Sequence, residues 1–376
     1  MPDFNSSGWR DPDIARRLVA GIHARAAQLS ECVHIMEVCG THTMSIAKNG
    51  LRGLLPENVR LLSGPGCPVC VTANADIDHA IALAGIDGVT VATFGDMLKV
   101  PGSSTSLAAE KAAGADVRVV YSPLDALELA EREPERQIVF IGVGFETTAP
   151  TVAATIKRAA AAQLDNFSVF SAHKTVPQAL RAIASDPDIA LSALILPGHV
   201  STIIGVAPYE FLADEFDIPG VITGFEPVDI LQGIYLLIQQ LAESARGTGQ
   251  VSIDIAYGRG VRGEGNPHAV ALIEEVFAAD DAEWRGLGVI PGTGLTLREP
   301  FAAFDARRRF SPEVEPARTV KGCECGDILR GIKRPDECRL FGRACVPERP
   351  VGPCMVSSEG SCAAWYRYGD GSGYAA

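Results

Sequence analysis

The chain has 376 residues, of which 47% are hydrophobic and 21% charged, and its formal net charge is −13. This composition is typical of a folded globular protein, and its length predicts two or three domains of roughly 100 to 200 residues each. So acidic a chain offers no broad basic surface, and we expect neither nucleic acid nor an anionic membrane as a partner. The sequence shows no secretion signal, and no apolar run approaches the roughly 18 residues that cross a bilayer, so we expect a cytoplasmic protein.

Short apolar runs alternate with helical patterns between residues 31 and 125, which predicts a first α/β domain. The expected strands cover residues 34–38, 59–63, 88–95 and 116–122, and the expected helices 74–85 and 106–115. Strands that alternate with helices favour a mostly parallel sheet with helices on both faces.

The same alternation continues between residues 126 and 250 and predicts a second α/β domain in tandem with the first. The expected strands cover residues 136–146, 167–173, 191–199 and 218–227, and the expected helices 124–133, 147–163, 176–186 and 228–244. The pattern loosens in residues 251–376, which we interpret as a smaller, loop-rich third domain joined by residues 1–30. It has one clear helix, near 269–279, and too few periodic apolar residues to rely on packing alone.

The ten cysteines fall into two groups separated by about 250 residues. Cys32, Cys39, Cys67 and Cys70 lie near the start, and the next cysteine is Cys323. In a reducing compartment such a distribution does not favour a structural disulfide framework. Cys32 belongs to no recognisable motif, and we expect it in the core.

The loop after the first predicted strand reads CGTHT, residues 39–43. Cys39 would lie at a strand end and at the start of a helix, where free N–H groups and the helix dipole stabilise a thiolate. His42, three residues later, could hydrogen-bond to that sulfur or bind a metal beside it. The alternative is a structural cysteine, since unpaired cysteines are often simply buried.

The stretch SGPGCPVCVT, residues 63–72, places Cys67 and Cys70 in a C-x-x-C motif between a strand and a helix. Structural zinc needs four nitrogen or sulfur ligands, typically from two such pairs, and the chain has no second C-x-x-C. The order of strand, loop and helix is that of a redox thiol pair. A thiol-exchange role is therefore favoured over zinc.

Six cysteines lie between residues 323 and 362, in a segment without histidine. Four thiolates suit either an iron–sulfur cluster or zinc. Two thiols are then left for a neighbouring redox pair. Spacing alone does not say which four converge.

The turn GVGFETT, residues 142–148, has features of a glycine-rich phosphate loop. It lacks the third glycine of the dinucleotide motif and the lysine of a P-loop, and Glu146 would repel a phosphate. We expect Glu146, Thr147 and Thr148 to orient a metal site instead. Three further histidines near turns are weaker candidates for neighbours of a metal: His173, His199 and His268.

Seven motifs that span nearly the whole chain together resemble the HypD family of hydrogenase maturation proteins. They are CGTHT, SGPGCPVCVT, FGDMLKVPGS, GFETTAP, PGHVS, GFEP and GPCMVSSEGSCAAWYRYG. The resemblance implies two tandem Rossmann-like parallel-sheet domains and a third domain that carries a [4Fe-4S] cluster.

The resemblance also implies an assembly scaffold more than a conventional turnover enzyme. With the small chaperone HypC, such a protein holds iron while two cyanides and one carbon monoxide are attached for [NiFe] hydrogenase, and HypE delivers the cyanides. We expect the chain itself to be a monomer. The competing hypotheses are an iron–sulfur thiol–disulfide reductase acting on a protein substrate, and a metal-stabilised binding module without a redox role.

Carried over residue by residue, the resemblance marks Cys39 as an iron ligand shared with HypC and His42 as its supporting residue. Cys67 and Cys70 match the family's thiol pair, which passes electrons between the cluster and the iron. We assign the cluster to Cys325, Cys338, Cys345 and Cys362. We assign a redox pair beside the cluster to Cys323 and Cys354.

Overall fold

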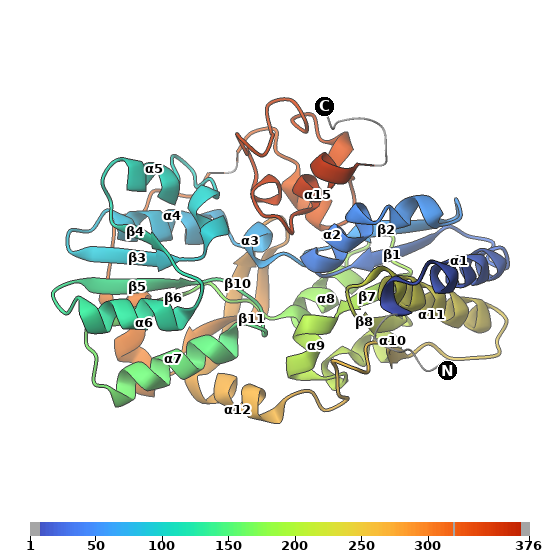
Figure 1. Cartoon of the computed structure of the whole chain (residues 1–376), viewed down its shortest axis with the longest axis horizontal. Coiled ribbons are helices and arrows are strands. Elements are labelled where there is room, and N and C mark those ends of the chain that lie inside the picture. Colours follow the sequence, from blue (N-terminus) through green and yellow to red (C-terminus); the bar gives the residue numbers. More distant parts are fainter. Residues whose placement is uncertain (1–7, 319, 370–376) are drawn as a thin grey trace.

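The strands of the chain form two parallel sheets that lie side by side, with a loop-rich C-terminal region next to both (Figure 1). The structure is a computed structural model that describes residues 8–318 and 320–369. Two Rossmann-like α/β sheets and a cysteine-bearing C-terminal region confirm the predicted fold class. In the described residues no helix is long and apolar enough to cross a membrane.

The first sheet has five strands, all parallel. In spatial order they are β2 (Val59–Ser63), β1 (Val33–Glu37), β7 (Ala193–Pro197), β8 (Gly220–Thr223) and β9 (Ile253–Ile255). One face is covered by α1 (Pro12–Ala26), α2 (Gly40–Lys48) and α11 (Pro227–Ala245). The other face is covered by α8 (Val176–Ala184), α9 (Gly198–Ile204) and α10 (Phe211–Phe216). The strands are rich in buried Val, Ile and Leu because both faces are covered.

The second sheet has four parallel strands. In spatial order they are β4 (Val117–Val119), β3 (Val89–Thr93), β5 (Gln137–Gly142) and β6 (Phe167–Ser171). Its two faces are covered by α4 (Asn74–Ala84) and α5 (Leu107–Ala112) on one side, and by α6 (Pro123–Arg132), α7 (Ala149–Ala161) and α12 (Pro267–Val276) on the other.

We expected one sheet to be built from the strands before residue 126 and the other from the strands after it. The two sheets instead combine strands from both sides of this boundary. The first sheet combines strands from residues 33–63 with strands from residues 193–255, and the second sheet uses the strands between them. The chain thus crosses from one sheet to the other twice, after β2 and after β6. Periodicity predicts eight of the nine strands of these two sheets and misses β9. The neighbour of a parallel strand, however, is set by packing between distant segments.

The N-terminal helix belongs to the first sheet and not, as we expected, to the C-terminal region. α1 packs on α11, with Gly21 against the ring of Tyr235, and so joins the helical layer of the first sheet. We had grouped residues 1–30 with the C-terminal region. The first seven of them lie outside the described residues.

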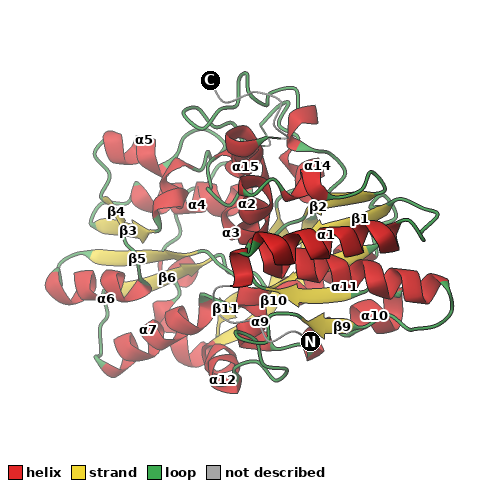
Figure 2. Cartoon of the chain, turned by 45° about the vertical axis from the view of Figure 1, so that its right-hand side comes forward, coloured by secondary structure: helices red, strands yellow, loops and turns green. Residues whose placement is uncertain are grey.

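A hairpin that we did not predict lies between the two sheets, formed by β10 (Phe277–Trp284) and β11 (Gly288–Leu297) (Figures 1 and 2). It makes a β-bridge to each crossing segment: Trp284 pairs with Thr72 in the first, and Gly294 pairs with Lys174 in the second. The Trp284 indole is buried and donates to Thr293 Oγ1 at 2.8 Å. The hairpin therefore holds both crossings in place.

The C-terminal region consists of loops and short helices, among them α14 (Cys325–Leu329) and α15 (Ser361–Tyr368). α15 packs on α2 of the first sheet, and the turn Pro353–Met355 packs on α3 (Pro68–Val71), which follows β2. The region is thus seated over the loops that leave the first sheet at the carboxyl ends of its strands.

Candidate functional site

Cys39 lies directly beside the C-x-x-C loop. It is the N-cap residue of α2, as predicted, and its side chain is buried. The N–H of Gly40 donates to the carbonyl oxygen of Gly66 at 3.0 Å. A Cβ atom on Gly66 would overlap the backbone nitrogen of Cys39, so only glycine lets the two loops come this close.

The thiol of Cys39 is less acidic than its position at a helix start suggests. Burial raises its pKa to about 11, and the carboxylate of Glu359 adds to this increase. The N–H groups of Thr41 and His42 act in the opposite direction but do not offset it. The expected stabilisation of the thiolate is therefore outweighed in the free protein, and a bound metal would have to displace the thiol proton.

His42 is fully buried and connects the loop after β1 to the loop after β8. Its Nε2 lies 2.9 Å from the carbonyl oxygen of Gly224 and 2.8 Å from Thr223 Oγ1. A carbonyl oxygen only accepts, so Nε2 carries the proton and Nδ1 keeps its lone pair. Burial lowers the pKa of His42 to about 4, and the ring is neutral at pH 7. Phe225 stacks on His42 at 4.7 Å between centroids and contacts His199 at 4.0 Å.

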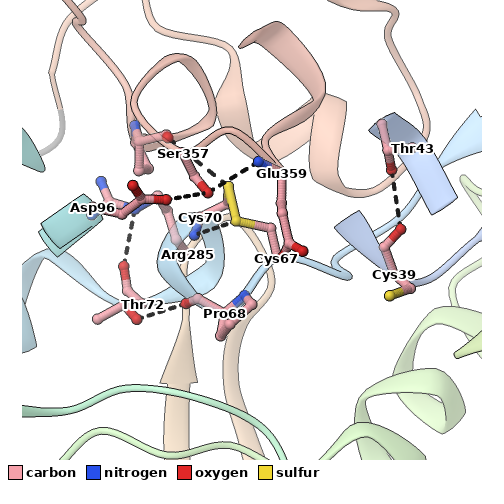
Figure 3. Close-up of a disulfide and its surroundings, with 11 residues drawn as sticks. Cys39, Thr43, Cys67, Pro68, Cys70, Thr72, Asp96, Arg285, Ser357 and Glu359 are labelled. Atoms are coloured by element: carbon pink, nitrogen blue, oxygen red, sulfur yellow. Dashed lines mark hydrogen bonds between the residues drawn. A yellow bond between two sulfur atoms is a disulfide. The ribbon is translucent and has the colours of Figure 1, made fainter. Parts of the chain in front are cut away.

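Cys67 and Cys70 are joined by a disulfide at the start of α3 (Figure 3). Their Cα atoms are 5.2 Å apart, and the N–H of Cys70 donates to Cys67 Sγ at 3.2 Å. Both cysteines are buried, and Cys70 Sγ lies 3.9 Å from the carbonyl oxygen of Pro353. The C-x-x-C pair thus contacts the loop before Cys354, and the other eight cysteines are free thiols.

All six C-terminal cysteines line one small pocket, which we call the C-terminal cysteine pocket. Its cysteines are Cys323, Cys325, Cys338, Cys345, Cys354 and Cys362. The remaining lining is apolar apart from backbone, with Ile328, Leu340, Phe341 and Met355. An all-sulfur donor set in an apolar pocket fits an iron–sulfur cluster in donor type and number. Among the described residues no three ligand side chains are yet arranged with the geometry of a metal site.

The contacts within this pocket bear on the assigned redox pair. Cys325 interacts by hydrogen bonds with both Cys323 and Cys354. Cys354 thus interacts with Cys325, which we had assigned to the cluster. The division of the six thiols into four ligands and one pair stays a prediction.

Two further residues near these cysteines, Arg285 and Glu359, were not among the predicted site residues. Arg285, in the turn of the hairpin, is half-buried. Its Nε donates to the carbonyl oxygen of Thr72 at 3.0 Å, and its backbone N–H donates to the carbonyl oxygen of Val71 at 2.9 Å. Its charge lies near the thiols of the C-terminal cysteine pocket, and its pKa is lowered by burial. Glu359 accepts from Thr41 Oγ1 at 2.7 Å, close to Cys39. Glu359 lies in the quoted tail motif, but Arg285 lies in a segment that reads as an ordinary turn.

The loop that carries Glu359 also reaches the second sheet. Ser357 Oγ donates to Asp96 Oδ2 at 3.0 Å, and Asp96 follows β3 (Figure 3). The C-terminal region is therefore bonded to the strand ends of both sheets.

Glu146 is buried, as a site-orienting residue would be. Its Oε1 accepts from the N–H of Val176 at 2.9 Å, and its Oε2 has no partner among the described residues. Burial raises the pKa of Glu146 to about 7. The charges of Glu146 and Cys39 both raise the pKa of the buried Tyr209, so all three groups share one region of the interior. Thr148 Oγ1 donates to the carbonyl oxygen of Phe145 at 3.2 Å, and its expected role beside a metal stays a prediction.

The weaker candidates are scattered. His173 is buried beside Ser171, with 3.1 Å between Nδ1 and Oγ. His268 is exposed on α12. Cys32 is exposed, and our expectation of a core position was wrong because the buried part of the strand begins one residue later, at Val33.

Comparisons with known proteins agree with the arrangement of these motifs. Residues 13–369 match the family described as HypD, hydrogenase formation hypA family. The chain is 46% identical to hydrogenase maturation factor HypD of Rhizobium leguminosarum bv. viciae, over 96% of this chain and 94% of that protein. It is 45% identical to the HypD of Rhodobacter capsulatus, over 97% and 98%, and 44% identical to that of Escherichia coli K12, over 96% of each. The chain therefore belongs to the HypD family of hydrogenase maturation factors.

Proposed function

We propose that this chain is a scaffold on which the iron centre of a [NiFe] hydrogenase is assembled. In this proposal the chain and a small chaperone, HypC, hold one iron ion between them while cyanide and carbon monoxide ligands are attached, with HypE as the cyanide donor. The iron with its ligands is the cargo, which is passed on. We place this activity in the cytoplasm.

The observation that carries the proposal is the order of three sulfur sites in space. Cys39 lies against the C-x-x-C loop through the hydrogen bond between Gly40 and Gly66. The C-x-x-C pair in turn lies against Pro353, beside the C-terminal cysteine pocket. The C-terminal cysteines are about 250 residues away from the other two sites in sequence, and these contacts bring all three sites together.

Each site has a separate task in this proposal. Cys39 gives the iron one soft anchor and leaves positions free for diatomic ligands and for a thiolate of HypC. The Cys67–Cys70 disulfide accepts two electrons and two protons to become two thiols, or releases them in the reverse step. A [4Fe-4S] cluster bound by Cys325, Cys338, Cys345 and Cys362 would supply single electrons. His42 and Glu146 do not bind the iron in this proposal. Through their hydrogen bonds to Gly224 and Val176 they position the loops near Cys39.

The alternative activity, reduction of a disulfide in a protein substrate, is less well supported. An attacking or resolving thiol must reach the surface during thiol–disulfide exchange. Cys67 is 4% exposed and Cys70 is not exposed at all. The burial of both sulfurs favours electron transfer within the complex.

The proposal is tested on protein produced together with HypC and purified without oxygen. We expect infrared bands of iron-bound cyanide and carbon monoxide, and we expect Cys39→Ala to abolish them. Cys32→Ala is the matched control, because Cys32 is an exposed thiol outside the site and its loss should leave the bands unchanged. Bands that persist in Cys39→Ala would contradict the proposal.

A further inference from the structure

A cavity of about 1030 Å³ lies along β2, outside the sulfur sites described above. Its walls are the whole of β2, the end of α2 with the turn that follows it, residues 331–335 after α14, and one side of α15. Figure 2 shows α2, β2, α14 and α15 gathered on this side of the molecule. We call this cavity the β2 groove.

The β2 groove is basic although the chain as a whole is acidic. Its lining has five cationic side chains, Lys48, Arg52, Arg60, Lys333 and Arg334, against the two carboxylates of Asp188 and Glu337. Lys333 and Arg334 are balanced by ion pairs with neighbouring carboxylates. Lys48 and Arg60 form no ion pair with another described residue, and both are exposed. The groove therefore carries uncompensated positive charge.

Arg52 adds an unsatisfied donor to the same wall. Its Nη2 lies 3.2 Å from Glu37 Oε1, and its guanidinium lies 5.2 Å from the centre of the Trp365 ring. Its Nε is buried and has no partner among the described residues. A carboxylate placed beside this guanidinium would supply an acceptor that the described residues do not.

The strand that forms the floor of the groove has a free edge. In the described part of the chain β2 pairs only with β1. Asn58 accepts from Val33, and Gly64 donates to Glu37, so every second residue of β2 is bonded to β1. The backbone groups of the residues between, Leu61 among them, therefore point away from β1 along the open edge.

Exposed apolar side chains gather at this edge as well. Ile332 and Tyr368, which line the groove, are 41% and 39% exposed, and Leu54 beside it is 42% exposed. They are three of the six large hydrophobic residues that are exposed in the described chain. An open strand edge flanked by apolar and cationic side chains is typical of sites that bind an extended peptide.

We propose that the β2 groove binds an extended acidic segment of a partner protein, which adds a strand to β2 and places carboxylates on Lys48, Arg52 and Arg60. The five residues of β2 offer about 16 Å of edge, which suits a peptide of about five residues. A single small anion would leave most of this edge unused. Among the described residues, no cysteine lines the β2 groove. Failure of this inference would therefore not contradict the proposed scaffold function, and failure of that function would not contradict this inference.

The test measures fluorescence anisotropy of a labelled peptide of six Glu-Thr repeats with the full chain at low ionic strength. We expect saturable binding that weakens with salt, and none with a peptide of six Lys-Thr repeats. The Glu-Thr peptide with its four central amides N-methylated should bind at least about tenfold more weakly, because it cannot donate to β2.

Two double variants make the test specific. Lys48→Glu with Arg60→Glu should weaken binding about tenfold or more, whereas Lys111→Glu with Arg132→Glu makes the same change of charge on exposed helices of the second sheet and should not. Absence of binding, or an equal loss in both double variants, would overturn the proposal. Equal binding of the N-methylated peptide, or equal competition by inorganic triphosphate, would show a general anion site and would also overturn it.

Discussion

Burial controls the protonation of the side chains around Cys39. Each of the three buried groups there favours its neutral form: the pKa of Cys39 is raised to about 11, that of His42 is lowered to about 4, and that of Glu146 is raised to about 7. The free protein thus keeps little charge in this region. A cation that binds Cys39 replaces a proton, so loading should become easier as the pH rises.

The raised pKa of Glu146 predicts how the free energy of unfolding changes with pH. Between its ordinary pKa of 4.5 and its folded pKa of about 7, the folded chain holds a proton that the unfolded chain has released. The folded state binds more protons, so the free energy of unfolding falls as the pH rises through this window, by on the order of 3 kcal/mol. We expect Glu146→Gln, which keeps the acceptor for Val176, to remove this fall.

The measurement is urea unfolding at pH 5, 6 and 7.5, with and without the substitution. His42 and His173 have lowered pKa values, so their contributions change with pH in the opposite direction. The difference between the two proteins isolates Glu146, because the histidines are common to both. If this difference does not change with pH, the carboxyl of Glu146 is ionised in the folded state and the expectation is wrong.

The sequence predicted where some residues lie in the fold, but not their acidity or their neighbours in space. The positions of Cys39 and His42 at the start of α2 were predictable, because they follow a strand that is recognisable by its apolar run. The acidity of Cys39 was not predictable, since it depends on burial in the folded chain and on the charge of the distant Glu359. Arg285 was missed for the same reason: only the folded chain brings it beside Thr72.

At the scale of elements, local pattern predicted eight of the nine strands in the two sheets and the longer helices between them, but not β9 or the helices α1, α9 and α10. Apolar runs of four to six residues and helical periodicity are set by burial on two faces, which the sequence carries directly. The hairpin was missed because β10 reads FAADDAEW, with no β-branched residue and three acidic ones, and six of its eight positions are not buried. Its stability comes from pairing with β11 and from contacts with both crossings.

Trp284 is the residue through which the hairpin holds the first crossing. Its ring is 1% exposed and stacks on Phe145 at 5.9 Å, and its backbone bridges Thr72, two residues after Cys70. We expect Trp284→Ala to lower the free energy of unfolding by about 3–5 kcal/mol. We also expect dithiothreitol to reduce the Cys67–Cys70 disulfide faster in this variant, because the loop is released.

Val289→Ala is the control on the same hairpin. Val289 is 66% exposed, so its truncation should change stability by less than about 0.5 kcal/mol and leave the reduction rate unchanged. Urea unfolding and the timed appearance of free thiols measure both quantities. Equal reduction rates in Trp284→Ala and the wild-type protein would mean that the hairpin does not restrain the C-x-x-C loop.

At the scale of the whole molecule, the two crossings explain why the sulfur sites meet. The chain leaves the first sheet after β2 and returns to it at β7, so the strand ends of both sheets face the segment that carries the C-terminal cysteines (Figure 1). The sequence predicted two sheets and a cysteine-bearing region but not this exchange of strands. Pairing between β1 and β7 joins residues about 160 apart, and no local pattern encodes it.

If the proposed cluster binds, the C-terminal region is the part of the molecule that it should stabilise most. Its described residues from 320 to 369 contain no strand, and α14 and α15 have five and eight residues. Helices this short are not stable without tertiary contacts, and six thiols replace part of an apolar core. A cluster that joins four of them would therefore stabilise the region directly.

Removing the cluster should expose this region and leave the two sheets folded. In anaerobic protein treated with an iron chelator, we expect trypsin to cleave between Lys321 and Arg349 at least about tenfold faster, since local opening precedes cleavage. A variant with Cys325, Cys338, Cys345 and Cys362 replaced by serine is the control. It should be cleaved quickly with or without chelator, which shows that the chelator acts through the cluster. Equal cleavage of the loaded and the chelated wild-type protein would mean that packing against α2 and α3 alone holds the region, and that the cluster has no structural part in it.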